Sequence, residues 1–387
     1  MRDDISKALG KDGERMRVLM AYWDGGGNVP PQRALARELT RRGHDVHVLT
    51  HDSLSKAVAS DGAAFHALAT APQWDGSRPH APGAETEFIV HHVGGSAAFP
   101  SDFLAANDAL RPDIGVIDVM LFTTLKAAAE RALPYVALNH LAWNLEARVA
   151  GLLSGLATHH TGYSFFELAE RAPMVLATTY PEFGTAKKVA PHVHFVGPIR
   201  EPVSEAPWPR RFPERPFVLV SLSSIYQEQE GTLRSVCEAL APLPLEVLVT
   251  TGRGVAPEAL PISGGLEARR FVQHDAVLPS VDLVVTHGGL GTVMFSAGAG
   301  APVLCLPNGR DQNDNAERVA ALGLGRALSN EAAPATIAEA VTALLADKAL
   351  RAKCRAFATQ VRRFGDLPRA ANLVIESGRA GNRATFG

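Results

Sequence analysis

The stretch LVVTHGGLGTVMFSAGA, residues 283–299, joins a short apolar run to a glycine-rich turn and then to a segment of helical composition. Glycines at the start of a helix let backbone N–H groups approach an anion closely, and the helix dipole adds about half a positive charge there. His287 and Thr292 can add side-chain hydrogen bonds. The turn therefore predicts either a phosphate-binding corner or a tight strand–helix connection capped by a histidine.

The order apolar strand, turn and helix also occurs before and after this stretch. An apolar run over 17–22 precedes a glycine-rich turn, an amphipathic segment over 30–42 that Gly43 ends, and a second apolar run over 45–50. Such strand–turn–helix–strand units are typical of parallel α/β sheets. Further strands are expected at 114–118, 135–138, 217–222, 245–250 and 302–306, with helices at 122–131 and 228–240 and over most of 311–380. The alternation predicts two doubly wound α/β domains that face each other across a cleft.

Two segments interrupt this alternation. Residues 69–100 are rich in Pro, Gly and His, and we expect a long excursion there. Residues 198–216 contain six prolines, which exclude a helix or a central strand and predict a semi-rigid linker between the domains.

Composition excludes several classes of protein. The 387 residues are 46% hydrophobic and 20% charged with a formal net charge of −2, so no global basic field points to nucleic acid or to an anionic membrane. No apolar run approaches the roughly 18–20 residues of a membrane span, and the charged N-terminus lacks the apolar core of a secretory signal. Cys237, Cys305 and Cys354 are few, scattered and odd in number, which favours a reducing compartment. We expect a soluble cytoplasmic protein.

Residues on either side of the glycine turn strengthen the phosphate-binding interpretation. Asp311-Gln312 stands nineteen residues after Thr292, followed by Asn315-Ala316, and the segment FVQHDAVLP occupies 271–279. Together these residues resemble the donor-binding signature of the family 1 (UDP-glycosyltransferase-like, macrolide-type) glycosyltransferases of the GT-B fold. The resemblance covers the chain from about residue 16 to about residue 378. It implies an N-terminal domain for the acceptor and a C-terminal domain for a nucleotide sugar.

The resemblance also implies roles for individual positions of the C-terminal half. His287 matches the histidine that binds the donor pyrophosphate, and Asp311 with Gln312 matches the pair that binds the hydroxyls of the transferred sugar. The remaining donor-binding positions are Phe271, Val272 and His274 at the nucleobase, and Ser224, Gly288, Gly289, Gly291 and Thr292 near the phosphates. Ser223 stands where the family usually has a glycine.

One departure bears on the choice of donor. Phe295 stands where plant-type members carry a glutamate that binds both ribose hydroxyls. Loss of that acceptor favours a dTDP-sugar over a UDP-sugar. The alternative is that Phe295 is a helix residue turned into the core, and the sequence leaves both readings open.

A second departure concerns the catalytic base. The family motif Gly-His-Val-x-Pro or Gly-Asp-Val-x-Pro corresponds here to residues 27–31, GNVPP, and the amide of Asn28 cannot accept a proton at neutral pH. Asp118 stands where the family has the carboxylate partner of the missing histidine. Three explanations stay open: Asp118 or Asp24 is the base, an acidic acceptor such as a phenol needs little help while Asn28 orients it, or catalysis is lost. Asp24 can equally be a turn former.

The residues expected to contact the acceptor form a less specific pattern than the donor-binding residues. In this fold Met120, Phe122, Trp143 and Phe165 would line an acceptor pocket, and each alone is also a candidate core residue. His140 follows a strand end and could touch the acceptor, or be an ordinary loop residue. The chain contains no Asp-x-Asp motif, which fits transfer without a metal ion. In that case the helix terminus and His287 would neutralise the charge of the departing diphosphate.

The sequence thus predicts an inverting, metal-independent glycosyltransferase that needs no cofactor besides its dTDP- or UDP-sugar. Its acceptor would be a hydrophobic natural product such as a polyketide, macrolide or phenolic aglycone. The predicted domains are 16–197 for the acceptor, 217–365 for the donor, the linker 198–216 between them, and a helix with a tail over 366–387 that returns to the first domain. A nucleotide-sugar 2-epimerase and a non-catalytic auxiliary protein that binds nucleotide sugars are the alternatives. The sequence leaves a monomer and a homodimer open.

Overall fold

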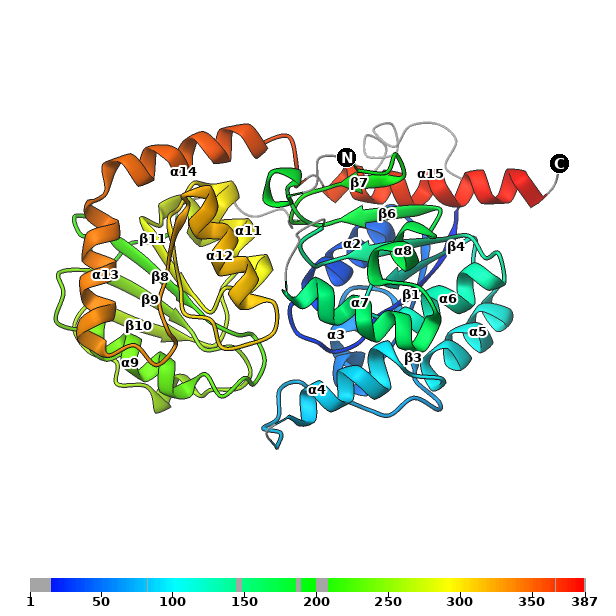
Figure 1. The fold of residues 1–387 in the computed structure, drawn as a ribbon, viewed down its shortest axis with the longest axis horizontal. Helices are drawn as coiled ribbons and strands as arrows, with labels where there is room; N and C mark the ends of the chain where they lie inside the picture. Colours follow the sequence, from blue (N-terminus) through cyan, green and yellow to red (C-terminus); the bar gives the residue numbers. More distant parts are fainter. Residues whose placement is uncertain are drawn as a thin grey trace, which may run out of the picture.

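Two parallel sheets, one in each half of the chain, organise the molecule (Figure 1). The computed structural model describes residues 15–81, 83–143, 148–185, 189–199, 208–365 and 367–385. In the part of the chain that the structure describes, neighbouring strands pair in parallel, as expected when the crossovers pass through helices. The predicted fold class, two doubly wound α/β units, is confirmed.

The N-terminal sheet has the strand order β3-β2-β1-β4-β5-β6-β7. Its strands are β1 (Arg17–Ala21), β2 (Asp45–Thr50), β3 (Ala64–Ala67), β4 (Ile114–Asp118), β5 (Tyr135–Asn139), β6 (Met174–Ala177) and β7 (Val193–Phe195). The C-terminal sheet has the order β10-β9-β8-β11-β12-β13. Its strands are β8 (Phe217–Ser221), β9 (Glu246–Thr250), β10 (Leu266–Arg269), β11 (Leu283–Thr286), β12 (Val303–Cys305) and β13 (Gly325–Ala327).

Helices connect the strands and cover both faces of each sheet (Figure 1). In the N-terminal half they are α2 (Val29–Arg41), α3 (Ser55–Ser60), α4 (Ala84–Phe88), α5 (Ala98–Leu110), α6 (Phe122–Glu130), α7 (Arg148–Thr161) and α8 (Phe165–Glu170). In the C-terminal half they are α9 (Glu230–Leu240), α10 (His274–Val277), α11 (Leu290–Ala299), α12 (Gln312–Leu322), α13 (Pro334–Ala346) and α14 (Lys348–Val361), followed by α15 (Leu367–Thr385). Short helical turns complete the set at Asp52–Leu54, Ile89–Gly94, Pro181–Phe183, Pro257–Ala259 and Leu278–Ser280.

The cores follow from the alternation of side chains along the strands. Successive residues of a strand point to opposite faces of its sheet. In β1, Leu19 therefore packs into one cluster with Ile117 and Phe122, whereas Met20 packs into the other with Val48 and Val116. Because both faces are covered, β1 and β4 are almost wholly buried, which explains their uninterrupted apolar sequences.

The segment 69–100 contains helices that the sequence did not predict, and several short strands were not predicted at all. The expected long excursion contains α4, the helical turn at Ile89–Gly94 and the start of α5. Strands β3 and β13 have three or four residues, and most of these are at least partly exposed. Runs this short carry no usable hydrophobic period, so only pairing with a neighbouring strand defines them.

The last helix, α15, lies along the N-terminal half although it follows α14 of the C-terminal half (Figure 1). Its buried residues Leu367, Ala370, Ala371, Val374 and Ile375 join the core cluster that contains Met16 and Leu35. The helix is amphipathic, so this apolar stripe explains why it packs there. Its first residue in the predicted range, Asp366, and the terminal residues 386–387 lie outside the described residues.

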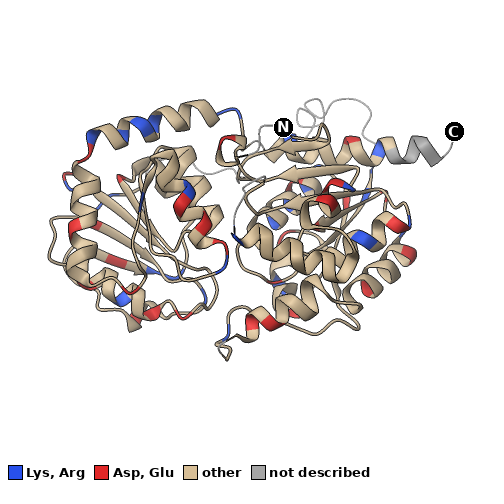
Figure 2. Cartoon of the chain, in the orientation of Figure 1, with Lys and Arg blue, Asp and Glu red and all other residues tan. Residues whose placement is uncertain are grey.

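Charged residues of both signs are interspersed over the two halves (Figure 2). This distribution agrees with the net charge of −2. Among the described residues, no helix is long and apolar enough to cross a membrane.

The docking of α15 can be tested by its effect on the stability of the protein. Val374→Ala removes two buried methyl groups and should lower the free energy of unfolding by about 1–3 kcal/mol. Glu376→Ala, an exposed position on the same helix, should change it by less than about 0.5 kcal/mol. Urea denaturation followed by circular dichroism measures both, and equal midpoints for the two variants would contradict this docking of α15.

Candidate functional site

The glycine turn after β11 forms an open helix terminus. Gly289 is the N-cap of α11 and no side chain caps the helix, so its first N–H groups are available to a ligand. Gly288 has φ +86°, and a Cβ there would lie 2.9 Å from the backbone oxygen of Gln312. A Cβ on Gly291 would meet nothing within 4 Å. The corner therefore combines a backbone that only glycine adopts readily with free space beside the helix terminus.

His287 lies in this corner as a neutral hydrogen-bond donor. Its Nδ1 is 3.3 Å from the hydroxyl of Thr286, which can donate to it and leave the proton of the imidazole on Nε2. Burial, aided by the positive charge of Arg310, lowers the pKa of His287 to about 3. The imidazole is thus uncharged at neutral pH and can offer an N–H to an anion without titrating.

Hydrogen bonds connect the turn before α12 to the glycine-rich turn 287–291, which we call the glycine corner. Asn315 donates from Nδ2 to the backbone oxygen of Gly288 at 3.0 Å and to Asp311 Oδ2 at 2.8 Å. The backbone N–H of Asn308 donates to Gln312 Oε1 at 2.7 Å, and Gln312 is 2% exposed. Asp311 is only partly buried. These bonds place Asp311 and Gln312 beside Gly288, the residue that follows His287.

The predicted nucleobase segment follows β10, the outermost strand of the C-terminal sheet. It therefore lies on the same side of the sheet as the turn after β11, where the parallel strands have their carboxyl ends. Phe271 is 77% exposed, the most exposed large apolar side chain of the described residues, whereas Val272 is buried. The ring of His274 lies 3.0 Å from Ser221 Oγ, and burial lowers its pKa to about 4. Phe295 packs edge-to-face on His274 with ring centroids 6.4 Å apart. Ser224 is exposed and Ser223 is buried.

On the N-terminal half, Asp118 is the centre of a buried hydrogen-bond cluster. Its side chain is 0% exposed at the carboxyl end of β4. Asn28 Nδ2 donates to Oδ2 at 2.7 Å, whereas Oδ1 lies 3.0 Å from His140 Nε2 and accepts from the N–H of Met120 at 2.9 Å. Both carboxylate oxygens are therefore engaged by the protein.

His140 differs from the histidines of the donor half in its charge environment. Burial opposes its protonation, but the charge and hydrogen bond of Asp118, with contributions from Asp311 and its own backbone carbonyl, raise the pKa of the imidazole above 6.5. Asp311 belongs to the other half of the chain, so charges from both halves act on His140. The sequence suggested His140 as an acceptor contact or an ordinary loop residue, and no pattern connected it with Asp118.

Asp24 has a structural partner in the C-terminal half. Its carboxylate is fully buried, accepts from Ser53 Oγ at 2.8 Å and forms an ion pair with Arg253 at 2.8 Å. A carboxylate held in this way is tied up in an ion pair and is poorly placed to receive a proton from a substrate. The two residues are 229 positions apart, so no local pattern announces the pair.

Arg310 is a further residue that sequence reasoning missed. It donates to the backbone oxygen of Gly25 at 3.1 Å and to Glu85 Oε2 at 3.0 Å, both in the N-terminal half. Its backbone has φ +52°, an uncommon conformation for a residue other than glycine. The only sequence signal is its place directly before the Asp311-Gln312 pair.

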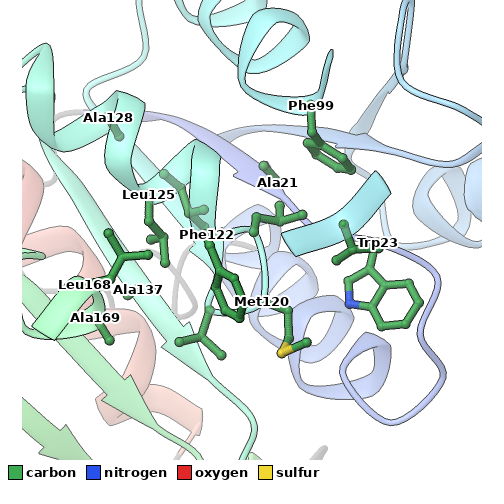
Figure 3. Packing of buried hydrophobic residues seen from close by; sticks show 14 of the residues in the cluster. Ala21, Trp23, Phe99, Met120, Phe122, Leu125, Ala128, Ala137, Leu168 and Ala169 are labelled. Atoms are coloured by element: carbon green, nitrogen blue, oxygen red, sulfur yellow. The ribbon is translucent and has the colours of Figure 1, made fainter. Parts of the chain in front are cut away.

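The predicted acceptor residues lie in the N-terminal core. Met120, Phe122, Trp143 and Phe165 are at most 6% exposed and belong to one cluster. Figure 3 shows Met120 and Phe122 within it. Phe122 packs edge-to-face on Phe165 with centroids 6.0 Å apart. Their burial follows from the uninterrupted apolar surface behind β4 and β5, and it supports the core interpretation of these four residues over the pocket interpretation.

A groove of about 800 Å³ separates α7 from α12. Arg148, Phe166, Asp314, Glu317 and Arg318 contribute to its walls, and none of the predicted acceptor residues does. Arg148 bridges it through an ion pair with Asp314 at 3.2 Å. Within the described parts of the chain, no group of three or more His, Cys, Asp or Glu side chains could hold a metal ion. The three cysteines are buried and unpaired.

Comparison with known proteins agrees with this architecture. Residues 234–363 match the family described as erythromycin biosynthesis protein CIII-like, C-terminal domain. The chain is 33% identical over 184 residues to demethyllactenocin mycarosyltransferase of Streptomyces fradiae, which is 47% of this chain but only 40% of that protein. It is 27% identical over 385 residues to oleandomycin glycosyltransferase of Streptomyces antibioticus, covering 90% of this chain and 87% of that protein.

A solved structure extends the similarity to the whole fold. The calicheamicin glycosyltransferase CalG4 superimposes with a TM-score of 0.75 at 26% identity, over 94% of this chain and 98% of that one. The resemblance predicted from the glycine corner and its neighbours is confirmed. The chain therefore has the GT-B fold, its residues 234–363 match the EryCIII-like C-terminal domain, and over most of its length it is similar to macrolide- and antibiotic-type glycosyltransferases.

Proposed function

We propose that the protein transfers a sugar from a nucleoside diphosphate donor to a hydroxyl group of a hydrophobic natural product. The observation that carries this proposal is the uncapped α11 terminus, where the neutral imidazole of His287 and the turn of Asp311 lie together. A diphosphate would find backbone N–H groups and an imidazole N–H there, with a carboxylate beside it for sugar hydroxyls. The names of the relatives, which are glycosyl- and mycarosyltransferases, support the same class of reaction.

The proposed reaction is a single displacement at the anomeric carbon. The acceptor oxygen forms a bond to that carbon as the bond to the diphosphate oxygen breaks, which inverts the configuration. The negative charge that develops on the leaving diphosphate is stabilised by His287 and by the α11 terminus, both fixed before reaction. These groups can do so without a divalent cation, and we propose metal-independent transfer on that ground.

We propose dTDP as the nucleotide. Phe295 lies beside His274 near the predicted nucleobase segment, and its ring offers no hydrogen-bond acceptor to a ribose 2′-hydroxyl. The exposed ring of Phe271 has a free face on which a base can stack. Calorimetric titration with dTDP and UDP, together with transfer assays using dTDP- and UDP-sugars, tests the proposal. Epimerised donor in the absence of acceptor would favour the 2-epimerase, and binding without any transfer would favour an auxiliary protein.

The first prediction concerns His287. His287→Ala removes one preorganised donor to the diphosphate and should lower kcat by roughly 100-fold or more. His159→Ala, an exposed histidine on α7, is the matched control and should behave as the unaltered protein. Steady-state transfer kinetics measure both, and near-normal turnover of His287→Ala would defeat the assignment of the diphosphate site.

Gly288 tests the same corner through its backbone. Gly288→Ala would force a side chain into a left-handed conformation at a cost of about 1–2 kcal/mol and push its Cβ against Gln312. We expect dTDP affinity to fall by about tenfold. Gly231→Ala in α9, where a Cβ meets nothing within 4 Å, should leave affinity unchanged and add about 0.5–1 kcal/mol of stability. Equal dTDP affinities would contradict a role for the corner.

Asp118 is predicted to act in transfer and not in donor binding. Asp118→Asn keeps the shape of the side chain but removes the charge that faces His140, so transfer to alcohols should fall by at least about 100-fold. The affinity for dTDP should change less than about twofold, because the donor corner lies on the other sheet. Asp108→Asn, an exposed carboxylate paired with Arg131, is the control. Unimpaired transfer by Asp118→Asn would contradict a role for this charge in transfer.

A further inference from the structure

The cluster around Asp118 contains one side chain that can accept a proton from a substrate. Asp118 is completely buried and both of its oxygens already accept hydrogen bonds from the protein. The Asn28 amide is a donor to Asp118 and to the backbone oxygen of Trp23, and it has no basic nitrogen. The imidazole of His140 is the remaining member, and its side chain is 11% exposed.

The contact with Asp118 determines which nitrogen of His140 is basic. A carboxylate can only accept, so in the neutral imidazole the proton lies on Nε2 and points to Asp118 Oδ1 at 3.0 Å. Nδ1 then carries the lone pair. Asn139 donates from Nδ2 to the backbone oxygen of Leu141 at 2.6 Å and closes the turn that presents His140. The ring is therefore held in one tautomer on a fixed turn.

The position of His140 matches the geometry of the transfer. It follows β5, next to β4 in the sheet, and the charge of Asp311, from the C-terminal half, acts on it. In the proposed function Asp311 binds the sugar that is transferred. Beside the pair, the buried Oδ1 of Asn28 has no partner among the described residues and can accept a hydrogen bond from a bound ligand.

We propose that His140 is the catalytic base, Asp118 its positioning partner, and Asn28 the residue that holds Asp118 in place. The inference rests on the proposed function. His140 Nδ1 takes the proton of the acceptor hydroxyl as the acceptor oxygen bonds to the anomeric carbon. The diphosphate leaves with the electron pair of the broken C–O bond, and Asp118 stabilises the imidazolium that forms.

This assignment has a definite pH dependence. The charged groups that act on His140 are Asp118, from the end of β4, and Asp311, from the turn before α12. Both favour the protonated imidazole, and only the neutral form can accept a proton. Transfer should therefore rise with pH through a midpoint above 6.5, the ordinary value for histidine, and reach its plateau on the alkaline side.

The test compares His140→Gln with the unaltered protein and with His159→Gln, the exposed histidine on α7. The glutamine can donate to Asp118 but cannot take a proton at neutral pH. Transfer from dTDP-glucose to phenol and to 4-nitrophenol is followed from pH 5 to 9, with dTDP affinity and circular dichroism as controls for folding. We expect His140→Gln to lower kcat for phenol by about 10²–10⁴-fold, to lose the acidic limb of the profile and to bind dTDP as before. The loss should be smaller for 4-nitrophenol, which is already acidic, and His159→Gln should match the unaltered protein.

Other outcomes would overturn the inference in distinguishable ways. If His140→Gln transfers to phenol within threefold of the unaltered rate, or keeps the same pH profile, His140 is not the base while the proposed function stands. If the unaltered protein transfers no sugar from any dTDP- or UDP-sugar, the proposed function fails and the role of His140 fails with it. Should His140→Gln not fold, ¹⁵N spectra of the histidines in the unaltered protein decide instead. The proposal requires the Nε2–H tautomer of His140 and a midpoint above 6.5 that falls in Asp118→Asn.

Discussion

A buried negative charge at the end of β4 is the constraint on which the N-terminal half of the site depends. An ionised carboxylate without solvent contact is stable only when donors surround it, because its hydration is lost and must be replaced. Asp118 obtains these donors from the turn after β1, from the turn that follows its own strand, and from the residue after β5. One buried carboxylate thus joins three loops through hydrogen bonds.

The C-terminal half has a different electrostatic requirement. Its corner must present positive character to a diphosphate without placing a permanent charge in a buried position. Neutral His287, the uncapped terminus of α11 and the Asn315 bridge to Gly288 provide partial charges whose directions are set by the backbone. Such groups are effective because they are already oriented and need not reorganise when charge develops.

Ion pairs and hydrogen bonds between the halves bring these two environments together. The Asp24–Arg253 pair, the bonds of Arg310 to Gly25 and Glu85, and the N–H of Tyr226 donating to the backbone oxygen of Gly76 at 2.9 Å all cross the junction. Ile225, which is 1% exposed, lies against Gly26 and Gly76, where a larger residue would be in close contact. These contacts explain how a group on one sheet can act on a ligand held by the other.

The sequence by itself determined the alternation of strands and helices, the ends of β4, the ends of β1 and β5 to within one residue, and the glycine-rich turn after β11, because each depends on residues that are close together in the chain. It also indicated Asp118 and Asn28 as the residues of interest. Only the tertiary structure decided that Asp118 meets Asn28 from 90 positions away and His140 from 22 positions away, and that Asp24 is occupied by Arg253. It likewise placed Phe122 and Trp143 in the core. Side-chain partners of this kind depend on how parallel strands are ordered in the sheet and on how the two sheets meet, and neither leaves a periodic signal in the sequence.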